Sequence, residues 1–148
     1  YIHQFHTKAL ESLPYSGNLV GRYVRYFNLP IRWKHTLNVG YTRGNWSHNL
    51  SQIHRDGYLD EPPISVANGS FIPANWRPRV DGYTTYSYSV TWTGIQNLKL
   101  GLGIKNLLDQ DPPFTAHMND FAAGAGWETR IADPRGRAYT LLVEYRFW

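Results

Sequence analysis

The side chains of this sequence that could coordinate a metal are histidines and aspartates. His3-x-x-His6 and the more widely spaced His48 and His54 have no acidic or cysteine neighbours that would complete a ligand set. Four aspartates in one connection could bind calcium, although aspartate is also a common turn residue: Asp109, Asp111, Asp120 and Asp133. We therefore predict that the chain binds no metal and uses no cofactor.

Catalytic motifs are not indicated either. The sequence contains no Ser/His/Asp arrangement around a nucleophile elbow and no paired carboxylates at adjacent strand positions. The Gly101-Leu-Gly103 run looks like the start of a dinucleotide-binding loop, but it lacks the third glycine and opens no helix. We expect that the protein is not an enzyme.

The composition narrows the remaining classes of protein. The 148 residues carry a net charge of +4 with scattered Lys and Arg, which argues against a nucleic-acid partner. No window approaches the roughly 20 apolar residues of a membrane-spanning helix. A transmembrane strand needs only about 9–11 residues with alternate positions apolar, so it leaves little trace in overall hydropathy. The mean hydropathy of -0.48 is therefore compatible with strands that cross a membrane.

Alternating apolar and polar residues predict the elements of the fold. The clearest run covers residues 98–105, where Leu and Ile alternate with Lys and Gly. The same pattern predicts about six strands and almost no helix, with strands over residues 1–9, 33–42, 46–58, 83–92, 98–105 and 137–148. The expected fold class is therefore all-β and antiparallel.

The connections between these strands fall into two classes. Those at 43–45 and 93–97 are tight, whereas those near 10–32, 59–82 and 109–136 are long and rich in Pro, Gly, Asn and Asp. Short turns at one end and long loops at the other are typical of outer-membrane barrels.

Charge and aromatic residues follow the same arrangement. In the clearly alternating strands the charged residues fall opposite the apolar set: Lys34, Lys99, Lys105, Glu144 and Arg146. A charge on the lipid face would cost about 2–4 kcal/mol at mid-bilayer, so we expect these residues to face a lumen. Aromatic residues gather near strand ends, as in membrane-interface girdles: Trp33, Tyr41, Trp46, Trp92, Tyr139 and Tyr145.

A combination of short motifs suggests a family. Asn106-Leu-Leu-Asp109 is followed by Asp111-Pro-Pro-Phe114, by a downstream Gly-Arg and by a terminal Tyr145-Arg-Phe147. From about residue 29 to 147 the chain resembles the C-terminal end of the β-barrel of TonB-dependent outer-membrane receptors. Further stretches that carry the resemblance are Leu29-Pro-Ile-Arg-Trp33-Lys-His, Tyr41-Thr-Arg-Gly-Asn-Trp46, Gly57-Tyr58-x-Asp60, Val80-Asp-Gly-Tyr83-Thr-Thr-Tyr86 and Asp133-Pro-Arg-Gly-Arg137.

Two departures from the family pattern are visible. Relatives carry a Gly-Tyr-Asp-Pro-Arg-like stretch in the last long loop, where this chain has Gly124-Ala-Gly-Trp-Glu-Thr-Arg130. Relatives also end at the aromatic residue of Tyr-x-Phe, whereas this chain adds Trp148.

The resemblance implies a larger transmembrane barrel of about 22 strands that is closed by a plug domain. Residues 1–148 would form its C-terminal segment of about six strands, without the plug and the upstream strands. Such a receptor lies in the outer membrane of a Gram-negative bacterium and imports a scarce nutrient of siderophore, cobalamin or oligosaccharide type. Its expected partners are outer-membrane lipid, the rest of the barrel and plug, the TonB complex through that plug, the barrel-assembly machinery and the nutrient ligand.

Substrate contacts are expected from the long loops and the lumen wall, because function concentrates on loops held by a rigid scaffold. The candidates are Tyr23, Tyr26, Trp76, Arg77, Arg79, Phe114 and Trp127. The family's C-terminal assembly signal would be carried by Tyr145, Phe147 and Trp148. The alternative is a soluble β-sandwich that binds carbohydrate through exposed Trp and Tyr rings.

Overall fold

A computed structural model describes residues 1–8, 10–24, 29–61, 78–117 and 126–147 of the chain. These residues form antiparallel β-structure and contain no helix, so the predicted all-β class is confirmed. In the same residues, no helix is long and apolar enough to cross a membrane.

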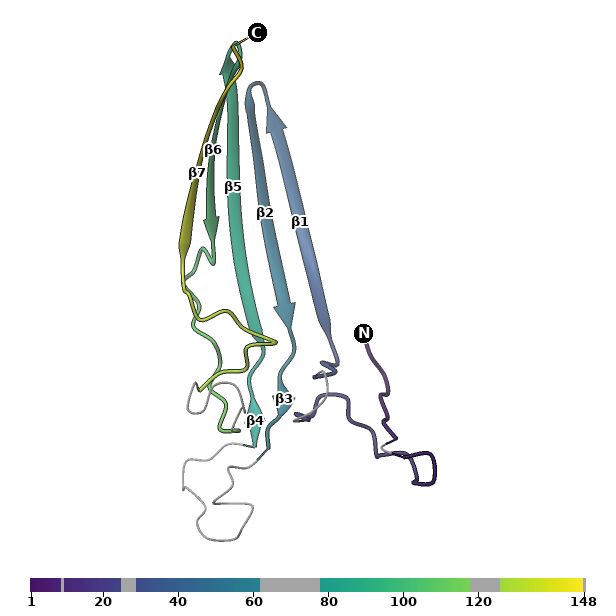
Figure 1. The fold of residues 1–148 in the computed structure, drawn as a ribbon. Helices are drawn as coiled ribbons and strands as arrows, with labels where there is room; N and C mark the ends of the chain where they lie inside the picture. Colours follow the sequence, from purple (N-terminus) through teal and green to yellow (C-terminus); the bar gives the residue numbers. More distant parts are fainter. Residues whose placement is uncertain (9, 25–28, 62–77, 118–125, 148) are drawn as a thin grey trace. The chain divides into compact units, whose positions relative to one another are not determined.

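The main sheet has five strands in the order β1-β2-β5-β6-β7. Neighbouring strands run in opposite directions, as the arrows in Figure 1 show. The strands are β1 (Lys34–Arg43), β2 (Trp46–Arg55), β5 (Tyr83–Ile95), β6 (Leu98–Lys105) and β7 (Ala138–Tyr145). Two short strands, β3 (Tyr58–Leu59) and β4 (Arg79–Val80), form a separate antiparallel pair.

The chain divides into two compact units. What we call the loop unit consists of Tyr1–Lys34, Arg55–Tyr83 and Pro112–Asp133. What we call the sheet unit consists of His35–His54, Thr84–Asp111 and Pro134–Trp148. The N-terminal residues, β3, β4 and most of the long connections thus form a unit of their own.

The strand boundaries agree with the alternation pattern at four of the six predicted strands. The predicted strand over 46–58 is interrupted at Asp56-Gly57, where a side chain on Gly57 would overlap the Val80 carbonyl oxygen. The predicted strand over residues 1–9 is wrong, since residues 1–8 form no strand. Their backbone bonds go to irregular segments instead, such as Leu19 N–H to the Phe5 carbonyl at 2.8 Å. The main sheet therefore has five strands rather than six.

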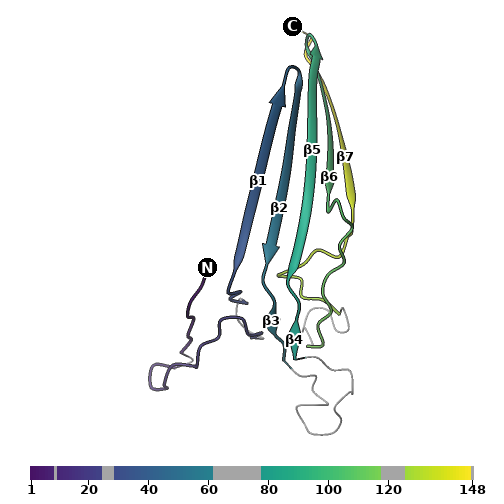
Figure 2. The same ribbon diagram turned by 180° about the vertical axis from the view of Figure 1, so that it is seen from behind.

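The two hairpin turns lie at the same end of the sheet (Figure 2). Gly44 in the β1–β2 turn has φ 56°, and Asn97 in the β5–β6 turn has φ 63°. Glycine and asparagine adopt this left-handed conformation most readily, which explains why the turns form there. Thr93 N–H donates to the Asn45 carbonyl at 3.0 Å and ties the two turns together. The long connections leave the sheet from the opposite strand ends.

The sheet has two chemically different faces. Leu102 pairs with Val90 on β5 and with Leu141 on β7, so these three side chains share a face. We call this side of the sheet the apolar face. By alternation along each strand, its members are Leu37, Val39, Tyr41, Leu50, Val90, Leu98, Leu100, Leu102, Ile104, Tyr139, Leu141, Val143 and Tyr145. The opposite polar face includes Thr91, Lys99, Gly101, Gly103, Lys105, Thr140 and Glu144.

The hydrophobic core lies in the loop unit. Among the described residues, every buried hydrophobic side chain belongs to that unit: Val20, Tyr23, Ile31, Tyr58, Val80, Tyr83, Ile131 and Ala132. The apolar face of the sheet is instead uncovered, with Leu37 55%, Val143 62% and Leu141 76% exposed. The strand residues in the core are Tyr58, Val80 and Tyr83 of the loop unit, whereas no described apolar side chain of the sheet unit is buried.

Candidate functional site

The most densely bonded group of polar side chains lies in the loop unit. It consists of Asp60, His117, Glu128 and Arg130, which we call the His117 cluster. Asp60 follows β3 and is positioned by its N–H, which donates to the Pro78 carbonyl at 2.9 Å. Glu128 begins a turn, in which its carbonyl accepts hydrogen bonds from the N–H groups of Ile131 and Ala132 at 3.0 Å each.

The His117 ring lies between two carboxylates. Nδ1 is 2.5 Å from Asp60 Oδ1, and Nε2 is 3.2 Å from Glu128 Oε2. All three side chains are about 1% exposed. A neutral imidazole has one N–H, so both contacts are hydrogen bonds only in the protonated ring. Burial opposes that charge, but the bonds to Asp60 and Glu128 outweigh it and raise the pKa of His117.

The two carboxylates are satisfied on their remaining sides. Asp60 Oδ2 accepts hydrogen bonds from the Thr115 hydroxyl at 2.8 Å and from Ala116 N–H at 2.7 Å. Arg130 donates to both oxygens of Glu128, from Nε at 2.8 Å and from Nη2 at 2.7 Å. Burial disfavours both charges. The bond from His117, with those from Ala116 and Thr115, nevertheless lowers the pKa of Asp60, and the bonds from Arg130 and His117 lower the pKa of Glu128. The cluster therefore contains two negative and two positive charges.

Aromatic side chains enclose these charges. The Tyr23 ring stacks on His117 with centroids 3.6 Å apart, and the Arg130 guanidinium lies 5.1 Å from the centre of the same ring. The Tyr58 ring lies 6.4 Å from His117, and burial raises the pKa of its hydroxyl. Contact with aromatic faces stabilises buried cations, so Tyr23 supports the charged form of the cluster.

The geometry of the cluster does not suit catalysis. Thr115 Oγ1 lies 2.5 Å from His117 Nδ1, as in a nucleophile–base pair. However, Thr115 is only 4% exposed, and its hydroxyl donates to Asp60. An imidazolium bonded at both nitrogens has no lone pair with which to take a proton. The arrangement instead joins separate chain segments through charge-assisted hydrogen bonds.

The cluster does not suit a metal either. The His117 ring separates the two carboxylates, so the three groups do not converge on one point. Elsewhere in the described ranges, no group of three or more His, Asp or Glu side chains is arranged to hold an ion.

A row of polar side chains crosses the apolar face. His48 Nδ1 lies 2.6 Å from the Tyr88 hydroxyl, and Gln52 donates to the Tyr86 hydroxyl at 2.9 Å. His54 bonds Thr84 at 2.8 Å, and His35 bonds Gln52 at 3.2 Å, so β1, β2 and β5 are linked. Alternate positions of β2 predict that His48, Gln52 and His54 share a face, but not that this face is the apolar one.

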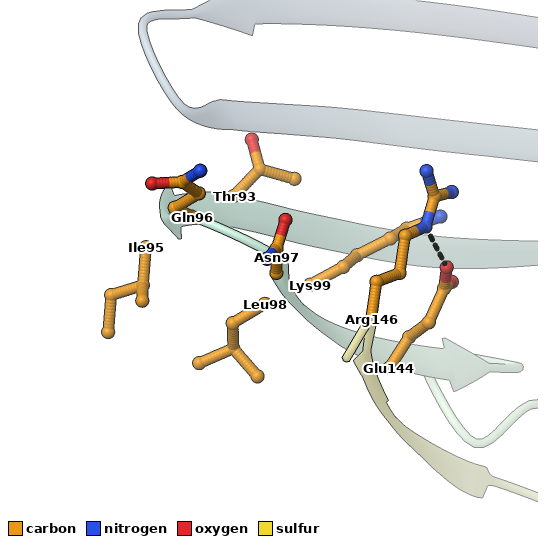
Figure 3. Close-up of a pocket in the computed structure, with 8 residues that line it drawn as sticks. All are labelled: Thr93, Ile95, Gln96, Asn97, Leu98, Lys99, Glu144 and Arg146. Carbon is orange, nitrogen blue, oxygen red and sulfur yellow. Dashed lines mark hydrogen bonds and ion pairs between the residues drawn. The ribbon is translucent and has the colours of Figure 1, made fainter. Parts of the chain in front are cut away.

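The predicted charged residues lie on the polar side of the sheet. A hollow of ≈ 330 Å³ beside the β5–β6 turn is lined by Lys99, Glu144 and Arg146 together with turn residues. Lys99 lies opposite Glu144 in the register of β6 and β7. Glu144 Oε1 accepts a hydrogen bond from Arg146 Nε at 3.3 Å. In Figure 3, Ile95 and Leu98 point away from this pair. Lys34 and Lys105 lie at the other ends of their strands.

The predicted substrate-contact residues are not gathered in one place. Tyr23 is 8% exposed and packs in the core, which leaves it little surface for a ligand. Arg79 is exposed on β4, and Phe114 is exposed with its ring against Gly126. Trp127 is half-buried, and its Nε1 is buried without a hydrogen-bond partner. Tyr26, Trp76 and Arg77 lie outside the described residues.

Two parts of the sequence motif meet in the sheet unit. Asp109 Oδ1 accepts a hydrogen bond from Arg137 N–H at 2.7 Å, across 28 residues of sequence. Gly136 has φ 68°, and a Cβ there would lie 3.0 Å from the same oxygen. The Asn106 side chain bonds both the N–H and the carbonyl of Gln110, at 2.9 and 3.0 Å. The Asn-Leu-Leu-Asp and Gly-Arg elements are thus one structural feature.

The C-terminal aromatic residues continue from β7. Tyr145 is the last residue of that strand, and the Phe147 ring packs edge-on against it with centroids 5.1 Å apart. Trp148, the third residue of the predicted assembly signal, lies outside the described residues.

Comparison with known proteins gives no relative from which a function could be transferred. No family model matches the chain, and no curated protein or solved structure matches it significantly. The fold and the surface define only a structural class. The chain is an antiparallel β-sheet protein with one uncovered apolar face and a separately packed loop unit.

Proposed function

We propose that the chain forms part of the wall and extracellular loops of an outer-membrane β-barrel receptor of the TonB-dependent type. The observation that carries this proposal is the location of the core. Among the described residues, no apolar side chain of the sheet unit is buried, whereas every buried hydrophobic side chain belongs to the loop unit. A contiguous apolar sheet face is unfavourable in water, and lipid is a partner that would cover it.

The dimensions of the strands support this proposal. The five strands contain 10, 10, 13, 8 and 8 residues. A tilted strand that crosses the hydrocarbon of a membrane needs about 9–11 residues. The short turns at one end and the long connections at the other also fit a barrel wall with loops on the outside.

The distribution of charge supports it as well. Apart from Arg43 at the turn, the five described strands carry no Lys, Arg, Asp or Glu on the apolar face. The polar row on that face is hydrogen-bonded between neighbouring strands, which lowers the cost of placing His and Gln near lipid.

The polar face and the loops would then carry the receptor function. The polar face would line the lumen, and the loop unit would contribute to the binding surface for a siderophore, cobalamin or oligosaccharide. The plug, the remaining strands and the TonB complex would come from outside these residues. A carbohydrate-binding β-sandwich is less well supported, because a sandwich buries the inward side chains of its strands.

A matched pair of substitutions on β7 tests the lipid assignment. Leu141 and Leu142 are adjacent, but Leu141 pairs with Leu102 on the apolar face and Leu142 pairs with Gly101 on the polar face. Leu141→Arg should cost about 2–4 kcal/mol if its side chain meets lipid. The amount of folded protein in the outer-membrane fraction, measured as the gel band whose mobility changes on heating, should fall in this variant. Leu142→Arg should leave most of that band in place.

Two results would contradict this proposal. One is equal loss of the outer-membrane form in both variants, because the two faces would then not differ in environment. The other is recovery of the unsubstituted protein as a water-soluble monomer that does not enter the outer-membrane fraction.

A further inference from the structure

The His117 cluster joins three separate segments of the chain. Asp60 comes from the β3 segment, His117 from the segment after Pro112, and Glu128 and Arg130 from residues 126–133. His117 and Asp60 are separated by 57 positions, and His117 and Glu128 by 11. Their bonds run through the His117 ring, so one proton governs contacts of all three segments.

Loss of that proton would leave the arrangement unsatisfied. A neutral ring can donate to Asp60 or to Glu128, but not to both, so its second nitrogen would present a lone pair to a buried carboxylate. The charge of the cluster would also change from balanced to a net excess of one negative charge. An unpaired buried charge is strongly destabilising, so the segments would separate to admit water.

We propose that the His117 cluster is a pH-dependent latch of the loop unit. It holds residues 112–117 and 126–133 against the β3 segment while His117 is protonated, and it opens when the ring becomes neutral. The charged and titratable groups packed around the ring are Asp60, Glu128, Arg130, Tyr23 and Tyr58. The latch goes beyond the receptor function and does not depend on what covers the apolar face.

The direction of the pH effect follows from the protonation states. His117 is stabilising while charged, and because its folded pKa is raised, the contribution is complete below about pH 6.5 and is lost as pH rises through the folded value. Asp60 and Glu128 have lowered pKa values, so their contribution is present above about pH 4 and is lost only in more acid solution. The latch is therefore closed below the raised pKa of His117 and opens as pH rises through it.

Amide hydrogen exchange tests the latch. The N–H groups of Ala116 and Arg130 bond Asp60 Oδ2 and Glu128 Oε1, so they report directly on closure. Exchange would be measured on the purified protein from about pH 6 to about pH 10, corrected for intrinsic rates, beside an NMR titration of the His117 ring. We expect protection of both amides to fall by at least about tenfold at the His117 midpoint, with protection of Leu102 in the sheet unit unchanged.

Two variants separate the latch from a merely structural role. In Glu128→Gln, the amide can donate to the neutral His117 Nε2 while Asp60 balances Arg130, so protection of Ala116 should no longer fall in alkali. In His117→Gln, protection should be low and independent of pH over the same range. His3→Gln, which changes an exposed histidine outside the cluster, should behave as the unsubstituted protein.

Several results would contradict the latch. Level protection of Ala116 and Arg130 up to about pH 10 would overturn the latch. So would an alkaline loss that persists in Glu128→Gln, that disappears in His3→Gln, or that occurs in parallel at Leu102, because each would place the titrating event outside the cluster.

Discussion

At His117, burial and charge act against each other, and hydrogen bonding decides the balance. The ring is removed from water, which disfavours its charged form, yet each nitrogen faces a carboxylate oxygen. Burying the charges of His117, Asp60 and Glu128 is favourable only because each has a partner of opposite sign at hydrogen-bond distance. Removal of one partner from this cluster should therefore destabilise the protein more than removal of one partner from an exposed ion pair would.

Asp60→Asn tests this balance. The variant loses the charge that faces His117 and part of the acceptor capacity used by Thr115 and Ala116. Because it removes one of the two carboxylates that face the buried His117 ring, we expect about 3–5 kcal/mol of destabilisation of the loop unit in denaturant unfolding near neutral pH. The unsubstituted protein should lose stability as pH falls through the lowered pKa of Asp60, and Asp60→Asn should not show this contribution. Asp111→Asn, at an exposed position, is the control, and equal effects would contradict the role of Asp60.

Gly57 offers a second test at the scale of one residue. A side chain there would overlap the Val80 carbonyl and crowd the backbone at Asp81 and Gly82. Gly57→Ala should therefore destabilise the β3–β4 pair by about 1–3 kcal/mol, as overpacking does elsewhere. Gly17→Ala, where no atom lies within 4 Å of the added carbon, should have little effect. Similar unfolding midpoints for the two variants would refute the close approach at Gly57.

Among the elements, alternation alone locates most strands but not their environment. The runs that became β1, β5, β6 and β7 could be predicted because each alternates cleanly. The face of β2 could not, since His48, Gln52 and His54 are polar yet lie on the apolar side, where hydrogen bonds to β5 satisfy them. The His117 cluster could not be predicted either, because no local spacing links a residue after β3 to side chains more than fifty positions later.

The connection between β6 and β7 depends on Asp109. Its carboxylate accepts the Arg137 N–H at 2.7 Å, one residue before β7 begins, so it fixes where that strand starts. Asp109→Ala should cost about 1.5–3 kcal/mol, the usual range for a hydrogen bond to a charged group. Exchange of the β7 amides should accelerate from the Ala138 end, whereas Asp111→Ala should leave it unchanged. Uniform exchange along β7 in both variants would contradict the anchoring role.

For the whole molecule, the decisive feature is that the loop unit holds the hydrophobic core, while no described apolar side chain of the sheet unit is buried. A water-soluble β-protein would show the reverse arrangement, since burial of strand side chains supplies its stability. We attribute the inversion to a lipid environment on the apolar face and a wet lumen on the polar face. Sequence patterning predicted the two faces, but it could not reveal that the core lies in the loops.

The most direct test of this assignment is a spin-label scan of β7. The chain contains no cysteine, so single cysteines at positions 139 to 144 can each carry one label in the membrane-embedded protein. We predict that labels at 139, 141 and 143 are relaxed mainly by oxygen, which concentrates in lipid. Labels at 140, 142 and 144 should be relaxed mainly by a water-soluble nickel complex, giving a period of two residues. Equal access of the nickel complex to both sets would contradict the assignment of the apolar face to lipid.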